Sequence, residues 1–280
     1  MSDVTRPLRV LYPGAVYHVT ARGNERRAIY RDAVDYEDFL RQLGLAVERY
    51  GWLCHGFCLM GNHYHLLVET PRANLPIGMR HLNGCYSASF NRRWKRVGHL
   101  FQGRYKAELV EKQAYLLALI RYVALNPLRT SPPLSAAPEQ YPWSSYSVLL
   151  GLTPRPPWLT VEWVLAQFGD DSAGARARLR AFVEKGLQER PTPVGGMYFA
   201  DDDFIRGATA TIRPIPEVPR EQWQPLRPEL DEIFAAYDDP VVAAYRAYGY
   251  TQREIAAYLG CHYTTVSRRL RRSEVRERKT

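Results

Sequence analysis

The chain has 280 residues, of which 46% are hydrophobic and 24% charged, a composition typical of globular domains rather than of disordered or fibrous proteins. Its net charge of +9 favours a polyanionic partner. No apolar run approaches the roughly 18 residues of a membrane span, and the N-terminus lacks the apolar core of a secretory signal. We therefore expect a cytoplasmic, nucleoid-associated protein without a membrane partner.

The cysteines exclude a disulfide framework. Only four occur, and no two of them form a CxxC pair. Cys54 and Cys58 fall in an apolar stretch, so we expect them to pack inside a strand. Such sparse usage fits a reducing compartment.

The first half of the chain alternates strand-like and helix-like patterns. Residues 14–22 read as a strand, and residues 35–50 place apolar side chains on one helical face. A buried strand over 52–60 and a second strand over 63–70 flank Gly61-Asn62, a hairpin signal.

The pattern continues with a helix over 75–94, a fourth strand over 101–110 and a helix over 112–125, which Asn126-Pro127 ends. The order β-α-β-β-α-β-α is the split βαβ pattern of ferredoxin-like domains. We therefore predict an α+β fold, with an antiparallel sheet and helices on one face.

Proline-rich stretches divide the rest of the chain, because proline rarely continues a helix or a central strand. We expect a catalytic domain over residues 1–150, a helical middle segment over 151–212 and a proline-rich linker over 213–230. Residues 231–280 are expected to form a helix-turn-helix domain.

The helix-turn-helix prediction depends on a helix start and a turn. Thr251 and Glu254 form a capping box, and a short turn at 260–262 precedes a basic helix. An ordinary helical hairpin is the alternative, but the basic end of the second helix favours DNA binding. The residues near its start that we expect to touch DNA are Thr264, Thr265, Ser267 and Arg268.

Two histidines mark a candidate metal site. His63 and His65 are two residues apart in a predicted strand, so both imidazoles point to the same face of the sheet. Tyr64 points to the opposite, helix-covered face. Two imidazoles on one face can bind one divalent ion, although an isolated HxH is more often surface or core.

The helix over 112–125 supplies the rest of the site. Tyr122 and Asn126 are one turn apart on one face, so the Asn126 amide oxygen can be a third ligand and Tyr122 can lie beside the metal. This donor set suits Mg²⁺ or Mn²⁺. Tyr122 would then attack a phosphate and become covalently joined to it. A core aromatic is the alternative for Tyr122, and Tyr115 is the rival nucleophile.

The chain resembles the REP-associated tyrosine transposases, relatives of the single-tyrosine HUH insertion-sequence transposases. The segments that carry this resemblance span about residues 8–150: YHVTARGNERRAIYRD (17–32), LMGNHYHLLVET (59–70), HLNGCYSASFNRRW (81–94), GHLFQGRYKA (98–107), LIRYVALNPLRT (119–130) and WSSY (143–146).

The resemblance implies that His63 and His65 are metal ligands, that Asn126 is the helix-borne polar ligand and that Tyr122 is the nucleophile. It also implies cleavage and joining of single-stranded hairpin DNA at palindromic repeats. Flanking duplex DNA is a further expected partner through the helix-turn-helix, and the sequence leaves open whether the protein is a monomer or a homodimer. His18 and His55 are expected to be structural. Further residues that we expect to contact DNA are Arg22, Asn24, Arg26, Arg27, Arg92, Arg93, Arg104 and Lys106.

Three other functions compete with this one. A non-catalytic, sequence-specific regulator needs only the basic clusters and the helix-turn-helix. A phosphodiesterase that uses water would cleave without Tyr122. An RNA-binding protein is disfavoured, because no strand carries the expected aromatic pattern.

Overall fold

The computed structural model describes residues 10–194, 196–209 and 226–277. The chain divides into two compact units, with the boundary between Ala200 and Asp201. Residues 151–200 thus pack in the same unit as the sheet. Residues 213–225 of the predicted linker lie outside the described residues.

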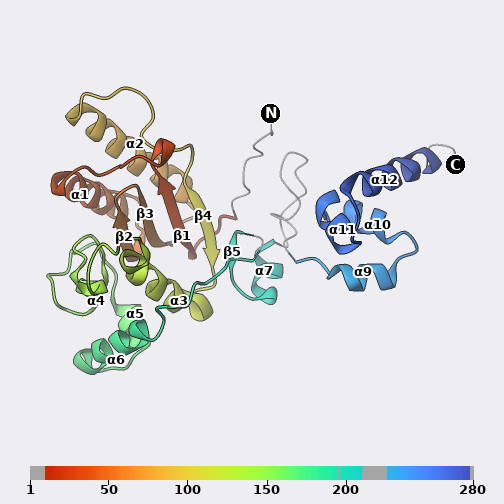
Figure 1. The fold of residues 1–280 in the computed structure, drawn as a ribbon. Helices are drawn as coiled ribbons and strands as arrows, with labels where there is room; N and C mark the ends of the chain where they lie inside the picture. The colour runs from red at the N-terminus through yellow and green to blue at the C-terminus, as the bar shows by residue number, and fades with distance from the viewer. Residues whose placement is uncertain (1–9, 195, 210–225, 278–280) are drawn as a thin grey trace. The chain divides into compact units, whose positions relative to one another are not determined.

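The sheet has the strand order that a split βαβ unit produces. Its first four strands run β2-β3-β1-β4, and every neighbouring pair among them is antiparallel. This confirms the predicted α+β class (Figure 1). The elements are β1 (Ala15–Arg22), α1 (Ala33–Tyr50), β2 (Leu53–Met60), β3 (His63–Thr70), α2 (Leu75–Arg93), β4 (Lys106–Val110) and α3 (Lys112–Leu125).

A fifth strand makes the sheet mixed, so the prediction of a purely antiparallel sheet was wrong. β5 (Tyr198–Phe199) pairs parallel to β4. The Leu109 amide donates to the Met197 carbonyl and the Glu111 amide to the Phe199 carbonyl, each at 2.8 Å. A strand of two residues is too short to show an alternating pattern, so its sequence gave no signal.

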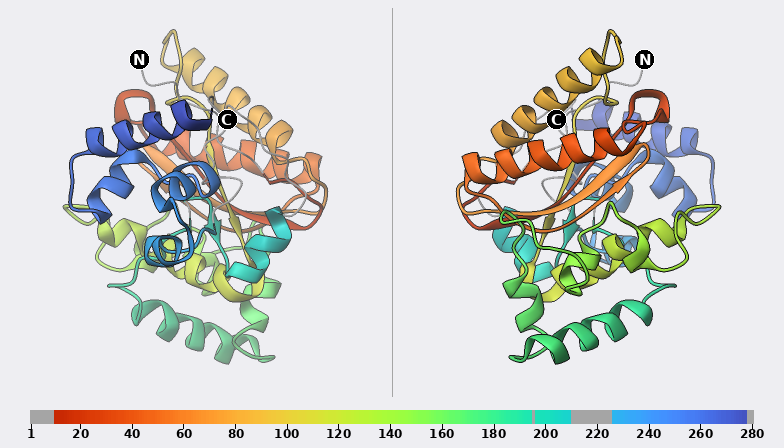
Figure 2. Two further views of the ribbon diagram at one scale, coloured as in Figure 1. Left: turned by 90° about the vertical axis from the view of Figure 1, so that its right-hand side faces the viewer. Right: turned by 90° about the vertical axis from the view of Figure 1, so that its left-hand side faces the viewer.

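The two faces of the sheet carry different helices. α1 and α2 lie on one side, whereas α3 crosses the other and packs on β2 and β3 (Figure 2). α1 begins where Asp32 accepts a hydrogen bond from the Asp35 amide, and it ends at Gly51, whose φ of +66° favours glycine. α3 ends at Asn126, before Pro127.

The chain after α3 covers the outer edge of β2. The Leu59 amide donates to the Trp143 carbonyl and the Thr160 amide to the Cys54 carbonyl, both at 2.8 Å. An edge strand covered in this way offers few free backbone groups to another chain. Cys54 and Cys58 are free thiols buried in β2, as predicted. The elements of this segment are η2 (Asn126–Arg129), η3 (Pro138–Gln140), α4 (Tyr146–Leu149), α5 (Glu162–Ala166) and α6 (Ser172–Glu184).

The end of α6 is fixed to α3 by two arginines. The Arg121 guanidinium lies 4.4 Å from the Phe182 ring centroid. Arg129 donates to the Gly186 carbonyl at 3.2 Å. These contacts account for the packing of the middle segment on the helix that carries Tyr122.

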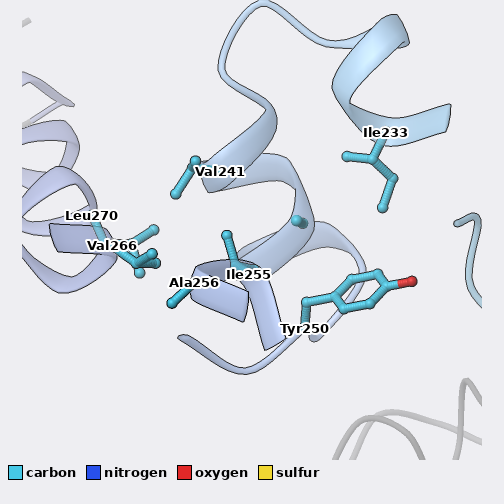
Figure 3. Close-up of a cluster of buried hydrophobic side chains, with 8 residues drawn as sticks. Ile233, Val241, Tyr250, Ile255, Ala256, Val266 and Leu270 are labelled. Atoms are coloured by element: carbon cyan, nitrogen blue, oxygen red, sulfur yellow. The ribbon is translucent and has the colours of Figure 1, made fainter. Parts of the chain in front are cut away.

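The second unit contains a small helical core (Figure 3). Its described elements are α7 (Asp202–Thr209), α9 (Leu230–Ala236), α10 (Pro240–Val242), a π-helical turn (Ala243–Ala247), α11 (Gln252–Tyr258) and α12 (Tyr263–Glu277). The Glu254 amide donates to Thr251 Oγ1 at 3.2 Å and the Thr251 amide to Glu254 Oε2 at 2.7 Å, which confirms the capping box. None of the helices described in either unit is long and apolar enough to cross a bilayer.

Candidate active site

His63 and His65 lie on the same face of β3, as the alternation predicts. Their ring centroids are 5.1 Å apart with the planes at 76°. Tyr64, between them, points to the other face, where its ring packs 4.8 Å from Phe39 and its hydroxyl donates to Asn83 Oδ1 at 2.7 Å. The strand therefore separates a packed face from a face that carries both imidazoles.

Helix α3 brings Tyr122 to this histidine face. The Tyr122 ring lies edge-on to His65 with centroids 5.7 Å apart, and edge-on to His18 at 6.1 Å. The side chain is half-buried. Tyr115, the rival nucleophile, makes no described ring contact with an imidazole. The geometry therefore distinguishes the two tyrosines.

Asn126 lies one turn beyond Tyr122 and is 9% exposed. Its Nδ2 donates to the Tyr122 carbonyl at 3.1 Å. The structure describes no contact between this amide and either imidazole. The third-ligand role of Asn126 thus stays a prediction.

Burial keeps both imidazoles neutral. Burial, and next to it the charge of Arg22, lowers the pKa of His63 to about 4. The pKa of His65 falls well below its usual range, mainly through burial and then through the neighbouring His18. Neutral imidazole is the form that binds metal ions.

Each imidazole makes its described hydrogen bond through Nδ1, so its Nε2 is available to another ligand. His63 Nδ1 lies 2.7 Å from Asn62 Oδ1, an acceptor, so Nδ1 carries the proton. His65 Nδ1 is hydrogen-bonded to His18, while its Nε2 is buried and has no hydrogen-bond partner within the described part of the chain. A buried nitrogen without a partner is costly unless something binds it.

The residues around these nitrogens fit a divalent ion. Two neutral imidazole nitrogens together with oxygen ligands, for which the Asn126 amide is the predicted protein donor, would form a mixed nitrogen and oxygen donor set that suits Mg²⁺ or Mn²⁺. In the regions described, no group of three or more His, Cys, Asp or Glu side chains could hold a metal ion. Any site here must therefore combine the two histidines with an amide, water or phosphate oxygen.

His18 and Glu108 join the site, although His18 was expected to be structural and Glu108 was not considered. His18 Nε2 lies 2.9 Å from His65 Nδ1, and His18 Nδ1 lies 2.6 Å from Glu108 Oε2. Burial would raise the pKa of Glu108, but hydrogen bonds from His18 and Lys106 lower it overall. Only the pairing of β1 with β3 and β4 brings these residues together, and the sequence does not contain that register.

The predicted DNA contacts fall into separate groups. Arg22 is exposed and pairs with His63 in the sheet register, and Lys106 pairs with Thr20, so both belong to the histidine face. Lys106 also lies 2.7 Å from Glu108. Both cations therefore lie on the β1 and β4 side of the strand that carries the two imidazoles.

The loop after β1 packs on the β2–β3 turn beside His63. Asn62 Nδ2 donates to the Arg26 carbonyl at 2.9 Å, and Asn62 O accepts from the Gly23 amide at 2.8 Å. Asn24, Arg26 and Arg27 are exposed, and Arg27 pairs with Glu25 at 2.6 Å. The loop therefore presents its polar side chains next to the metal-site candidate.

Arg92, Arg93 and Arg104 lie elsewhere. Arg93 bridges Asp32 at 2.6 Å and Asp35 at 2.5 Å, which fixes the end of α2 to the start of α1. Arg92 is exposed at the same end of α2. Arg104 was placed on the fourth strand, but Gly103, with φ +72°, turns the chain before β4. Arg104 lines a cavity of about 710 Å³ beside α2.

Helix α12 presents the predicted duplex contacts. Val266 and Leu270 are buried in the core of the second unit. Thr265 and Arg268 are exposed, whereas Thr264 and Ser267 are half-buried. The His262 ring lies 2.9 Å from Thr264 Oγ1 at the start of the helix. The helix thus has an apolar face for packing and a polar face for a ligand.

Comparison with known proteins identifies both units. Residues 12–126 match the family model described as IS200-like transposase, and residues 240–276 match a homeodomain-like domain. A solved structure of a REP-associated tyrosine transposase bound to a REP hairpin is 14% identical, covers 54% of this chain and 89% of its own, and has a TM-score of 0.45. A search of curated proteins gave no match. Residues 12–126 are thus similar to the IS200-like transposases, and residues 240–276 are similar to homeodomain-like domains.

Proposed function

We propose that this protein is a metal-dependent, single-strand DNA endonuclease and strand transferase that forms a 5′-phosphotyrosine through Tyr122. The observation that carries the proposal is the edge-on approach of Tyr122 to His65 at 5.7 Å, on the sheet face that also holds His63. Transposases of this family generally depend on a divalent metal.

The residues would divide the work as follows. His63 and His65 hold Mg²⁺ or Mn²⁺ through Nε2, with Asn126 as the third protein ligand. When bound, the ion neutralises charge on the scissile phosphate. Arg22 and Lys106, on the two neighbouring strands, would attract the DNA backbone.

The reaction exchanges one phosphoester for another. The Tyr122 oxygen forms a bond to phosphorus while the bond from phosphorus to the 3′ oxygen breaks. The phenolic proton passes to water, and water returns a proton to the departing 3′ oxygen. The products are a 5′-phosphotyrosine and a free 3′ hydroxyl. A 3′ hydroxyl that attacks the phosphotyrosine reverses the step and joins strands, without a nucleotide cofactor.

The proposed substrate is single-stranded hairpin DNA at palindromic repeats, and the second unit would bind flanking duplex. A helix-turn-helix presents its second helix to the major groove, and α12 has Thr265 and Arg268 exposed there. The solved structure of the REP-associated tyrosine transposase is described as bound to a REP hairpin, and we expect this protein to bind a hairpin of this kind.

A covalent-trapping assay tests the proposal. The protein is mixed with labelled hairpin oligonucleotides and Mn²⁺ or Mg²⁺, then run on a denaturing gel. We expect an adduct that disappears in Tyr122→Phe and in His63→Ala/His65→Ala. Tyr115→Phe is the matched control and should keep it. Cleavage that survives Tyr122→Phe would indicate a water-using nuclease, and duplex binding without cleavage would indicate a regulator.

A further inference from the structure

His65 is one end of a hydrogen-bonded row of three buried side chains. His18 lies between Glu108, at 2.6 Å, and His65, at 2.9 Å. His18 is 4%, His65 6% and Glu108 6% exposed. The His18 and His65 rings are parallel within 4°, which suits a hydrogen bond in the plane of both rings.

We propose that Glu108 and His18 are positioning residues that keep the proton of His65 on Nδ1, so that its Nε2 lone pair is held ready for the metal ion. This inference rests on the proposed function, because it assigns two residues behind the metal ligand of that site.

The carboxylate of Glu108, at one end of the row, determines which group donates in each hydrogen bond. An ionised carboxylate only accepts hydrogen bonds, so His18 Nδ1 must donate to Glu108. In a neutral His18 ring, Nε2 is then an acceptor, and His65 Nδ1 must donate to it. The remaining nitrogen of His65, Nε2, therefore has a lone pair and no proton.

The opposite arrangement fits the surroundings poorly. A doubly protonated His18 would donate to His65 Nδ1 and move the proton of His65 to Nε2. That N–H would be buried without an acceptor among the described residues, which is unfavourable. A cation bound at Nε2 satisfies the first arrangement and cannot satisfy the second.

His55 provides a comparison within the same sheet. It is also buried and lies 2.9 Å from a carboxylate, that of Glu69. Its ring faces Trp163 rather than another imidazole or Tyr122. Because His55 has a similar burial and partner but no contact with the site, its substitution controls for the general cost of removing a buried histidine.

The first measurement is the tautomer of His65 in the metal-free, full-length protein. Long-range ¹H–¹⁵N NMR distinguishes a proton on Nδ1 from one on Nε2. We expect Nδ1–H in the wild type, and a mixture in Glu108→Gln, because an amide can donate as well as accept. A wild-type His65 protonated on Nε2 would overturn the inference.

The second measurement is Mn²⁺ affinity, from the EPR signal of free Mn²⁺ and without DNA. Loss of a hydrogen-bond partner behind a metal-binding histidine typically lowers metal affinity 10–100-fold, and we expect His18→Leu to do so. His18→Gln should restore most of the affinity, because its amide can donate to Glu108 and accept from His65. His55→Leu should leave the affinity unchanged.

These outcomes separate the positioning role from the proposed chemistry. A folded His18→Leu protein that binds Mn²⁺ as tightly as the wild type would refute the positioning role. If His18→Leu fails to fold, the wild-type tautomer and the His18→Gln affinity still decide. Mn²⁺ binding that depends on His18 in a protein that forms no DNA adduct would refute the tyrosine chemistry and leave the positioning role in place.

Discussion

The Tyr122 ring meets the His65 imidazole edge-on within one chain, with the two planes at 84°. The proposed nucleophile and the proposed metal ligand therefore come from the same polypeptide. This relationship decides what a mixture of two defective proteins can do.

We expect no complementation between Tyr122→Phe and His63→Ala/His65→Ala. Each mixed pair still lacks either the tyrosine or the imidazoles in every single-chain site. The measurement is the yield of covalent adduct after the two proteins are mixed, with the wild type diluted into inactive protein as the control. Recovery of a substantial share of the wild-type yield would show that tyrosine helices are exchanged between subunits.

Arg129 should contribute to the stability of the fold. Its guanidinium lies 5.1 Å from the Tyr122 ring centroid and donates to the Gly186 carbonyl, so it joins the tyrosine helix to the segment after α6. Arg129→Ala should lower the free energy of unfolding by about 1–3 kcal/mol, because it removes the hydrogen bonds of a charged donor to partly buried carbonyls. Urea unfolding measures this. Arg129→Lys should recover little, since lysine lacks the planar fork.

Arg268, one of the exposed arginines on α12, should affect the binding of duplex DNA but not the formation of the covalent adduct. Arg268→Ala should weaken binding to duplex DNA and reduce the slope of log K against log salt by about one, as the loss of one phosphate contact does. Adduct formation on a short hairpin should not change. Arg269, which lies 3.3 Å from Asp239, provides the control, and Arg269→Ala should have the smaller effect. Equal effects would assign α12 only a general electrostatic role.

Glu69 should make stability depend on pH. It accepts hydrogen bonds from His55 at 2.9 Å and Lys112 at 2.5 Å, and the first of these is the main cause of its lowered pKa. A carboxylate with a depressed pKa in the folded state stabilises the fold above its unfolded pKa, and this contribution is lost as the pH falls through the folded pKa. Glu69→Gln should therefore be less stable than the wild type at pH 7, by about 1–3 kcal/mol.

The stability difference between the wild type and Glu69→Gln should depend on pH in the acidic range. Urea unfolding at a series of pH values should show the difference between wild type and Glu69→Gln shrinking below about pH 4, where the unfolded carboxyl takes up its proton. A difference that stays constant down to pH 3 would show that the loss comes from packing rather than from charge.

Local sequence patterns predicted the strands and helices whose side chains follow a regular period. Alternation along 63–70 placed His63 and His65 on one face, and helical spacing placed Tyr122 and Asn126 one turn apart. These are properties of a single strand or helix, which a sequence specifies directly. The strand order followed because short connections leave a split βαβ unit few alternatives.

Contacts between distant segments could not be predicted in this way. His18 and Glu108 are 90 residues apart, and only the strand register makes them partners. Arg93 reads as a DNA-binding cation in the sequence, yet it pairs with Asp32 and Asp35 across two helices. Arg104 is a different case, because Gly103, whose φ of +72° favours glycine, is itself a local turn signal that removes Arg104 from β4.

The attachment of the middle segment sets the practical limit for a shortened protein. A fragment that stops near residue 150 would lose β5, which pairs in parallel with β4, and β4 carries Glu108. It would also lose the Gly186 carbonyl, to which Arg129 donates a hydrogen bond. It would also lose the chain that pairs with Cys54. The smallest fragment suitable for crystallisation with a hairpin oligonucleotide should therefore extend to Ala200.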